Sequence, residues 1–189
     1  MKLLDKILAA NSTFVKPGVF PPLPKDPKQQ FAIFTCMDTR LVEFLEPAMG
    51  IKRGDAKVIK NAGNTLVDPL HGGVIRSLVA AIFTLGVEEV FVIGHRDCGM
   101  ASVDAVALKQ RMVARGIPAA TIDELVPDLA QWLGTFGCPE ENVADVVAKI
   151  RRNPLIPQDV PIHGLIFCPT DGHLDVIING YDNLRQETA

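Results

Sequence analysis

Two short motifs in this 189-residue chain contain residue types that bind metal ions. Cys36, Asp38 and Arg40 alternate in the first motif, and Cys98 follows three residues after His95 in the second. Thiolates and imidazoles are ligands that zinc prefers, and three protein ligands leave one coordination position for water or substrate. The two motifs therefore predict a zinc site of the catalytic kind, with Cys36, His95 and Cys98 as its ligands.

The charge of such a site indicates what Asp38 and Arg40 could do. Two thiolates and a neutral imidazole cancel the charge of zinc, so this centre acidifies a bound water less than zinc on three imidazoles does. A nearby carboxylate that orients the nucleophile would compensate. Asp38 suits this role, but it could also bind zinc as a fourth ligand and close the site. A bidentate pair with Arg40 would hold Asp38 off the metal.

The elements that must position these residues alternate between strands and helices. Short apolar runs predict the strands, and longer patterned segments predict the helices. The predicted strands are 31–36, 56–60, 90–94, 162–168 and 174–178, and the predicted helices are 41–49, 73–85, 97–115 and 139–152. This alternation is typical of an α/β fold. We expect a mostly parallel central sheet of order 2-1-3-4, with a C-terminal antiparallel strand and flanking helices.

This strand order would bring the two motifs together. Cys36 ends the first strand and His95 follows the third, and ligand sites in such sheets lie where the strand order reverses. An extended backbone would aim Cys36, Asp38 and Arg40 the same way. One helical turn would place Cys98 beside His95. We therefore expect the three ligands to converge at the carboxyl ends of the strands.

A helix and a proline-rich arm are predicted before the first strand. Four apolar residues near the start share one helical stripe: Leu3, Leu4, Ile7 and Leu8. Residues 15–30 contain five prolines, which exclude a helix or a central strand and favour an extended arm. The arm could carry its helix to a second subunit or lie on its own domain, and the pattern alone favours neither.

Composition narrows the class of protein. The length suits one domain over 1–189, with the helix and arm in 1–30 and a core in 31–180. A net charge of −3 argues against nucleic acid as a partner. No apolar run has a transmembrane length, and Asp5 and Lys6 interrupt any secretion signal. Four cysteines without such a signal indicate reduced thiols or metal ligands, and hence a cytoplasmic protein.

The remaining thiols and histidines lack ligand spacing to the main set. A single cysteine at the end of a strand or helix is usually a buried apolar residue. We expect structural or solvated roles for Cys138, Cys168, His71, His163 and His173.

At these motifs the chain resembles the β-class carbonic anhydrases, and most of all their short prokaryotic branch. The resemblance is carried by Cys36-x-Asp38-x-Arg40 and His95-x-x-Cys98. It extends from about residue 31 to 180, with flanking similarity at 53–64, 74–77, 94–100 and 163–167.

The resemblance implies a full set of roles. Zinc would be held by Cys36, His95 and Cys98, and Asp38 and Arg40 would form a catalytic dyad, with Asp38 as fourth ligand in a closed state. Zinc-bound hydroxide would hydrate CO2 reversibly to bicarbonate and a proton. The substrate would be a small molecule, with no nucleic-acid or membrane partner. The family also implies a homodimer or larger homo-oligomer, built partly by exchange of N-terminal helices.

Other functions stay open at this point. COS and CS2 are also linear electrophiles, and their hydrolysis on the same zinc site would need the same motifs. A zinc-binding regulatory protein without catalysis would result if Asp38 stayed on the metal. A hydrolase with Cys98 as nucleophile beside His95 is a further possibility. Plant-type members carry a substrate-binding Gln where this chain has Lys52, so that role is assigned to no residue. The loop 67–73 looks longer than in close relatives and could reshape the site entrance.

Overall fold

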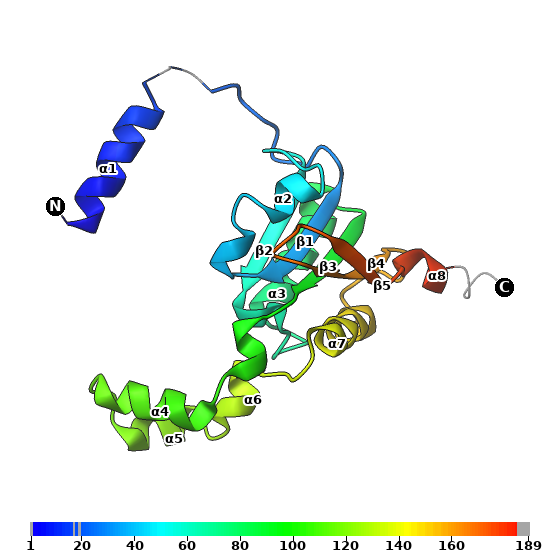
Figure 1. The fold of residues 1–189 in the computed structure, drawn as a ribbon. Coiled ribbons are helices and arrows are strands. Elements are labelled where there is room, and N and C mark those ends of the chain that lie inside the picture. Colours follow the sequence, from blue (N-terminus) through cyan, green and yellow to red (C-terminus); the bar gives the residue numbers. More distant parts are fainter. Residues whose placement is uncertain (1, 17, 19, 185–189) are drawn as a thin grey trace.

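A five-stranded sheet forms the centre of the structure, a computed structural model that describes residues 2–16, 18 and 20–184. Its order is β2-β1-β3-β4-β5 (Figure 1). The strands are β1 (Phe31–Cys36), β2 (Ala56–Asn61), β3 (Glu89–His95), β4 (Ile162–Phe167) and β5 (Leu174–Ile178). The first four strands are parallel, and β5 is antiparallel to β4. The predicted α/β class and strand order are confirmed.

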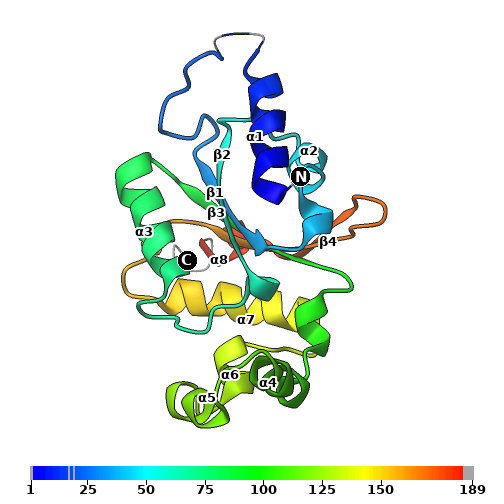
Figure 2. The ribbon, with the colours of Figure 1, turned by 90° about the vertical axis from the view of Figure 1, so that its left-hand side faces the viewer.

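Helices cover the two faces of the sheet unequally (Figure 2). α3 (Gly73–Leu85) and α7 (Pro139–Arg152) pack on one face, where their apolar residues share a buried core with the strands. Both helices have strong end signals, because Gly86 takes a left-handed C-cap after α3 and acidic residues occupy the first turn of α7. The other face carries the short α2 (Leu45–Ala48), and Tyr181 near the end of the described chain packs on His163 there. The buried cluster on this face includes both motif cysteines.

Two of the predicted helices are wrong in extent. The predicted helix 41–49 is only α2, preceded by a 3₁₀ turn at Thr39–Leu41. The predicted helix 97–115 begins only at α4 (Ala105–Ala114), because the carboxylate of Asp104 caps that helix. A loop with a 3₁₀ turn at Gly99–Ser102 precedes α4. The second motif therefore runs from the end of β3 into a loop, rather than into the start of a helix.

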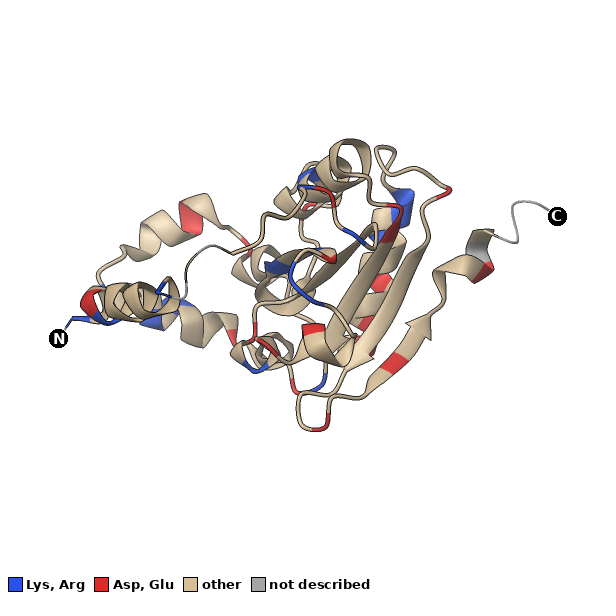
Figure 3. Ribbon diagram, turned by 90° about the horizontal axis from the view of Figure 1, so that it is seen from above, with Lys and Arg blue, Asp and Glu red and all other residues tan. Residues whose placement is uncertain are grey.

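The chain makes a helical excursion between the second motif and α7. It contains α4, α5 (Ala119–Leu125) and α6 (Leu129–Leu133), which extend away from the sheet (Figure 1). A final short helix, α8 (Gly180–Leu184), contacts β4. In Figure 3, positive and negative residues are scattered along the described chain. Among the described residues, no helix is both long and apolar enough to cross a membrane.

α1 (Leu3–Phe14) stands away from the core at the end of the predicted arm (Figure 1). None of its side chains is buried. The arm is in contact with the core by Lys25, whose carbonyl oxygen accepts from the side chain of Lys57. The backbone N–H groups of Lys28 and Gln29 then donate to the loop before β2. Pro17 and Val19 of the predicted arm lie outside the described residues. The prediction of an N-terminal helical arm is confirmed over the part that the structure describes.

Candidate metal centre

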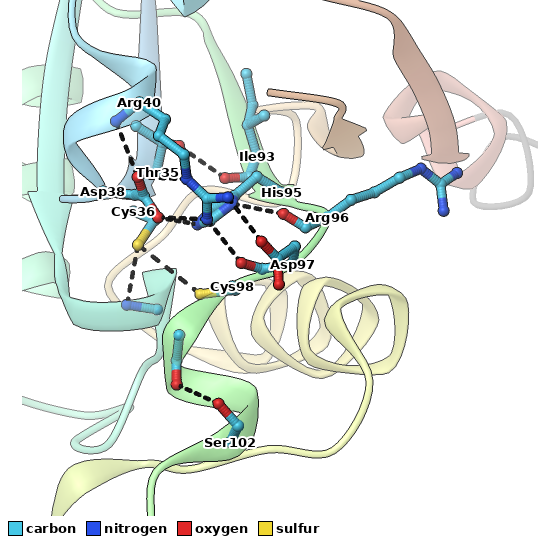
Figure 4. Close-up of polar contacts among 12 residues, drawn as sticks. Thr35, Cys36, Asp38, Arg40, Ile93, His95, Arg96, Asp97, Cys98 and Ser102 are labelled. Atoms are coloured by element: carbon cyan, nitrogen blue, oxygen red, sulfur yellow. Dashed lines mark hydrogen bonds and ion pairs between the residues drawn. The ribbon is translucent and has the colours of Figure 1, made fainter. Parts of the chain in front are cut away.

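The three predicted ligands meet at the carboxyl edge of the sheet. Cys36 ends β1 and His95 ends β3, and these strands are neighbours. Cys36, His95 and Cys98 are buried, with 4%, 1% and 5% of their surfaces exposed. Their ligand atoms all lie within 4.8 Å of one another (Figure 4). The structure thus brings together the residues that the two motifs single out.

The donor atoms fit a zinc ion. The Sγ atoms of Cys36 and Cys98 are 4.0 Å apart. Two thiolates on one tetrahedral zinc, with bonds of about 2.3 Å, would be about 3.8 Å apart. The Nδ1 atom of His95 lies 2.9 Å from the carbonyl oxygen of Arg96, whereas its buried Nε2 has no hydrogen-bond partner in the described part of the chain. Nδ1–H therefore donates to Arg96, and the lone pair of Nε2 is left for a metal.

In both motifs the backbone conformation differs from the predicted one. Asp97 has a φ of 53°, so His95 and Cys98 do not share a helical turn. Asp38 is the N-cap of the 3₁₀ turn that contains Arg40, so the first motif is not extended throughout. Asp is one of the residues that tolerate positive φ, and it is a strong N-cap. The side chains converge because the chain turns at Asp38 and again at Asp97.

Of the two thiols, Cys36 ionises more readily. Its Sγ shares a hydrogen bond with Sγ of Cys98 and accepts one from the backbone N–H of Gly63 at 3.3 Å. The contact with Cys98 first of all, and then those with His95 and the backbone, lower the pKa of Cys36 to about 4 although burial opposes this. The same contact with Cys36, together with burial, raises the pKa of Cys98. Burial opposes the charged form of His95, but its contact with Cys36 raises the pKa of His95 overall. A divalent cation would let both thiols ionise and keep the imidazole neutral.

Asp38 and Arg40 form a bidentate pair beside the ligands. Nε of Arg40 donates to Oδ1 of Asp38 at 3.0 Å, and Nη2 donates to Oδ2 at 2.8 Å. These hydrogen bonds lower the pKa of Asp38 to about 2. Oδ2 of Asp38 also lies 3.7 Å from Nε2 of His95. Asp38 is therefore close to the ligand atoms while its carboxylate is engaged by Arg40.

Sequence reasoning missed three residues that support this arrangement. Asp97 accepts two hydrogen bonds from Arg40, both at 2.7 Å. Gly63 donates to Cys36, and the side chain of Asn142 in α7 donates to the carbonyl oxygen of Gly63 at 3.2 Å. The position of Asp97 between two predicted ligands is a signal in the sequence that could have identified it. Asn142 gives no local signal, since its partner lies 79 residues earlier in the chain.

A cleft of about 340 Å³ opens onto the site. It is lined by Cys36, Met37, Asp38, Thr39, Ala62, Gly63, Cys98, Gly99 and Met100. Mostly apolar or small residues and one carboxylate suit a small uncharged molecule better than a large or anionic one. Neither Lys52 nor any residue of the 67–73 loop lines this cleft. The expectation that the loop shapes the entrance is therefore not met within one subunit.

The other thiols and histidines stay apart from this centre. Among the described residues, Cys36, His95 and Cys98 are the one group of Cys, His, Asp and Glu side chains placed to hold a metal ion. His163 is buried, stacks on Phe91 and accepts a hydrogen bond from the backbone N–H of Gly180. It fastens the C-terminal segment to the sheet, which is the structural role expected for it.

Known proteins resemble this chain over nearly its whole length. A carbonic anhydrase family model matches residues 31–174. YtiB of Bacillus subtilis, named as a candidate carbonic anhydrase, is 42% identical over 188 residues, which cover 97% of this chain and 100% of YtiB. The crystal structure of β-carbonic anhydrase isoform I from Trichomonas vaginalis is 42% identical, with a TM-score of 0.91 and coverage of 96% and 100%.

A relative that is named for a different activity is also similar. The carbon disulfide hydrolase of Acidithiobacillus thiooxidans is 33% identical over 154 residues, which cover 75% of this chain and 74% of that protein. The family match nevertheless spans well over half of the chain and includes both metal motifs. The chain therefore belongs to the carbonic anhydrase family, in its β class, and zinc is its cofactor.

Proposed function

We propose that this protein catalyses the reversible hydration of CO2 to bicarbonate and a proton. The observation that carries the proposal is the carboxylate of Asp38, which Arg40 holds in the cleft with Oδ2 3.7 Å from Nε2 of His95. When bound, zinc supplies Lewis acidity that makes water a nucleophile near neutral pH. The remaining work of binding and orientation belongs to the chain's own residues.

Asp38 orients the attacking water rather than removing its proton. Because its pKa is about 2, the carboxylate is ionised at neutral pH and acts only as a hydrogen-bond acceptor. A base this weak takes up a proton poorly at pH 7, so the proton of the reaction passes to solvent through the open cleft. Arg40 keeps the carboxylate in place, because turning Asp38 toward the ligands would break two charge-assisted hydrogen bonds.

Hydrolysis of COS or CS2 is the second candidate. The same residues would orient water against a linear molecule that ends in sulfur, and one relative is named a carbon disulfide hydrolase. The cleft walls at Met37, Ala62 and Met100 offer no group that selects oxygen over sulfur. A regulatory protein without catalysis is less well supported, because the carboxylate of Asp38 is engaged by Arg40.

A parallel assay on CO2, COS and CS2 separates these functions. Zinc-quantified protein would be followed by stopped-flow proton release with CO2 and by sulfide release with the other two. We expect CO2 hydration to be the fastest reaction. Rapid sulfide release with negligible CO2 hydration would replace the proposal by its alternative. Inactivity on all three substrates between about pH 6 and pH 9 would favour a regulatory role.

We further infer that the chain works as a homo-oligomer. Leu3, Leu4, Ile7 and Leu8 on α1 are 73%, 65%, 55% and 57% exposed. A 12-residue helix is marginal in water unless its apolar stripe is covered, and a second copy of the chain is the cover that the family resemblance implies. Deletion of residues 1–14 should lower the native mass measured by light scattering. An unchanged mass would remove α1 from the interface.

A cytoplasmic location is proposed on chemical grounds. Cys36 and Cys98 bind zinc only as reduced thiolates, and reducing compartments keep them so. Cell fractionation with an antibody to the native chain tests this, and recovery in a secreted fraction would contradict it.

A further inference from the structure

Arg40 is held from two sides, and only one of them is Asp38. On the other side, Nη1 donates to Oδ2 of Asp97 and Nη2 donates to the carbonyl oxygen of Asp97, both at 2.7 Å. Figure 4 shows the guanidinium lying between the two aspartates. Since Asp97 sits between His95 and Cys98, Arg40 ties the first motif to the loop that carries two of the ligands.

The backbone of Asp97 is in the conformation that makes both contacts possible. Its φ of 53° is uncommon for a residue with a side chain, although Asp and Asn tolerate it better than most. The side chain is 87% exposed, so the packing of neighbours does not fix its position. Its carboxylate and its carbonyl group nevertheless both reach the same guanidinium. The turn at Asp97 therefore builds a two-point acceptor for Arg40.

We propose that Asp97 is a positioning residue that braces Arg40. The proposal rests on the function proposed above for Asp38 and Arg40. A long flexible side chain with a single partner loses its ordered position whenever that partner leaves. The brace keeps the guanidinium in place when Asp38 turns away, and so favours the return of Asp38 to its pair. A larger fraction of the protein molecules then has Asp38 paired with Arg40, in the position where it can orient water.

Two substitutions weaken or remove the side-chain half of the brace without disturbing the turn. Asn and Gly both accept a positive φ, so Asp97→Asn and Asp97→Gly should keep the backbone contact to Arg40. Asn removes the charge alone, and Gly removes the whole side chain. Asp159→Asn is the matched control, because Asp159 is an exposed aspartate before β4, at the opposite edge of the sheet.

Side-chain NMR of Arg40 tests the brace directly and needs no substrate. Hydrogen bonds to both aspartates should slow rotation of the guanidinium and give separate signals for its Nη protons. These signals are assigned to Arg40 because they should be missing from the spectrum of Arg40→Lys. Asp97→Gly should average these signals, while Asp159→Asn should leave them separate. Separate, unshifted signals in Asp97→Gly would overturn the proposal.

Turnover and metal content give the second test. With zinc fully loaded, Asp97→Gly should lower kcat for CO2 by about three- to tenfold and Asp97→Asn by less, because the lost contact is charge-assisted but exposed. Zinc content should not change. With cobalt in place of zinc, the visible bands should shift toward those of a site with a fourth protein ligand. Loss of zinc from Asp97→Asn would show that Asp97 supports the ligand loop instead, and would overturn the brace.

The two tests also separate this inference from the proposed function. A native protein that fails to hydrate CO2, but whose separate Arg40 signals average in Asp97→Gly, would remove the proposed function and support the brace. A native protein that hydrates CO2, with equal kcat and equal Arg40 signals in Asp97→Gly, would keep the function and remove the brace.

Discussion

The ligand set and the dyad lie side by side but are built in different ways. Cys36, His95 and Cys98 are almost fully buried, and two of them end adjacent strands. The side chains of Asp38 and Arg40 are 17% and 41% exposed and are held by hydrogen bonds on a loop. The proposed metal site is therefore built into the sheet, whereas the proposed orientation of the attacking water depends on contacts that can break and re-form.

This contrast separates two kinds of substitution. Changes in the ligand set should alter zinc content first and activity as a consequence. Changes in the dyad should alter activity while zinc stays bound.

Loss of a ligand should have the largest effect. Cys36→Ser and His95→Ala should each fall far below one zinc per chain and lose at least about a thousandfold in turnover, because a serine hydroxyl stays protonated and Ala offers no donor. Metal analysis of purified protein and stopped-flow assays measure both quantities. Cys168→Ser is the control, since Cys168 contacts Thr170 and not the ligands. Full zinc content in both variants would contradict the assignment of Cys36 and His95 as ligands, and with it the distinction between the ligand set and the dyad.

Loss of the Asp38 carboxylate should be next in size. Asp38→Asn should keep one zinc per chain, since Asp38 pairs with Arg40, and should lower kcat about a hundredfold because the water loses its oriented acceptor. The same metal analysis and kinetic assay apply. Zinc loss in this variant would indicate that Asp38 is itself a ligand, and would contradict the separation of the ligand set from the dyad.

Removal of Arg40 should have a smaller effect and a different cause. Arg40→Ala should lower turnover about tenfold, because free Asp38 can bind zinc as a fourth ligand, and the ion should become harder to extract with a chelator. Since both residues act through one carboxylate, Asp38→Asn combined with Arg40→Ala should be no slower than Asp38→Asn alone. Normal activity in zinc-replete Arg40→Ala would contradict this account of the dyad.

The smallest expected effect is on proton binding by Asp38. Hydrogen bonds from Arg40 lower the pKa of Asp38 from 3.8 to about 2. Its contribution to stability is therefore present above pH 3.8 and is lost as the pH falls through about 2. Carbon NMR of the Asp38 carboxyl should show a higher pKa in Arg40→Ala, and the pair should add little to stability because both side chains are partly exposed. Equal pKa values in both proteins would leave Arg40 without an electrostatic role.

Prediction from the sequence succeeded where local signals are strong. Apolar runs such as Phe31–Cys36 predicted the buried strands, and the types and spacing of Cys36, His95 and Cys98 predicted which residues would meet. The predicted helix 97–115 was wrong, because the positive φ of Asp97 and the capping by Asp104 were not read from the pattern. Contacts of Asp97 with Arg40, and of Asn142 with Gly63, join residues 57 and 79 positions apart and depend on the folded turns.

One measurement tests the central claim most directly. Zinc content and CO2 hydration would be determined on the same samples of the native protein and of Asp38→Asn, each loaded to several levels of zinc. We predict that native activity rises in proportion to bound zinc, and that Asp38→Asn binds as much zinc with a slope about a hundredfold lower. Equal slopes, or full activity of native protein without zinc, would contradict a buried metal site controlled by a separate, hydrogen-bonded dyad.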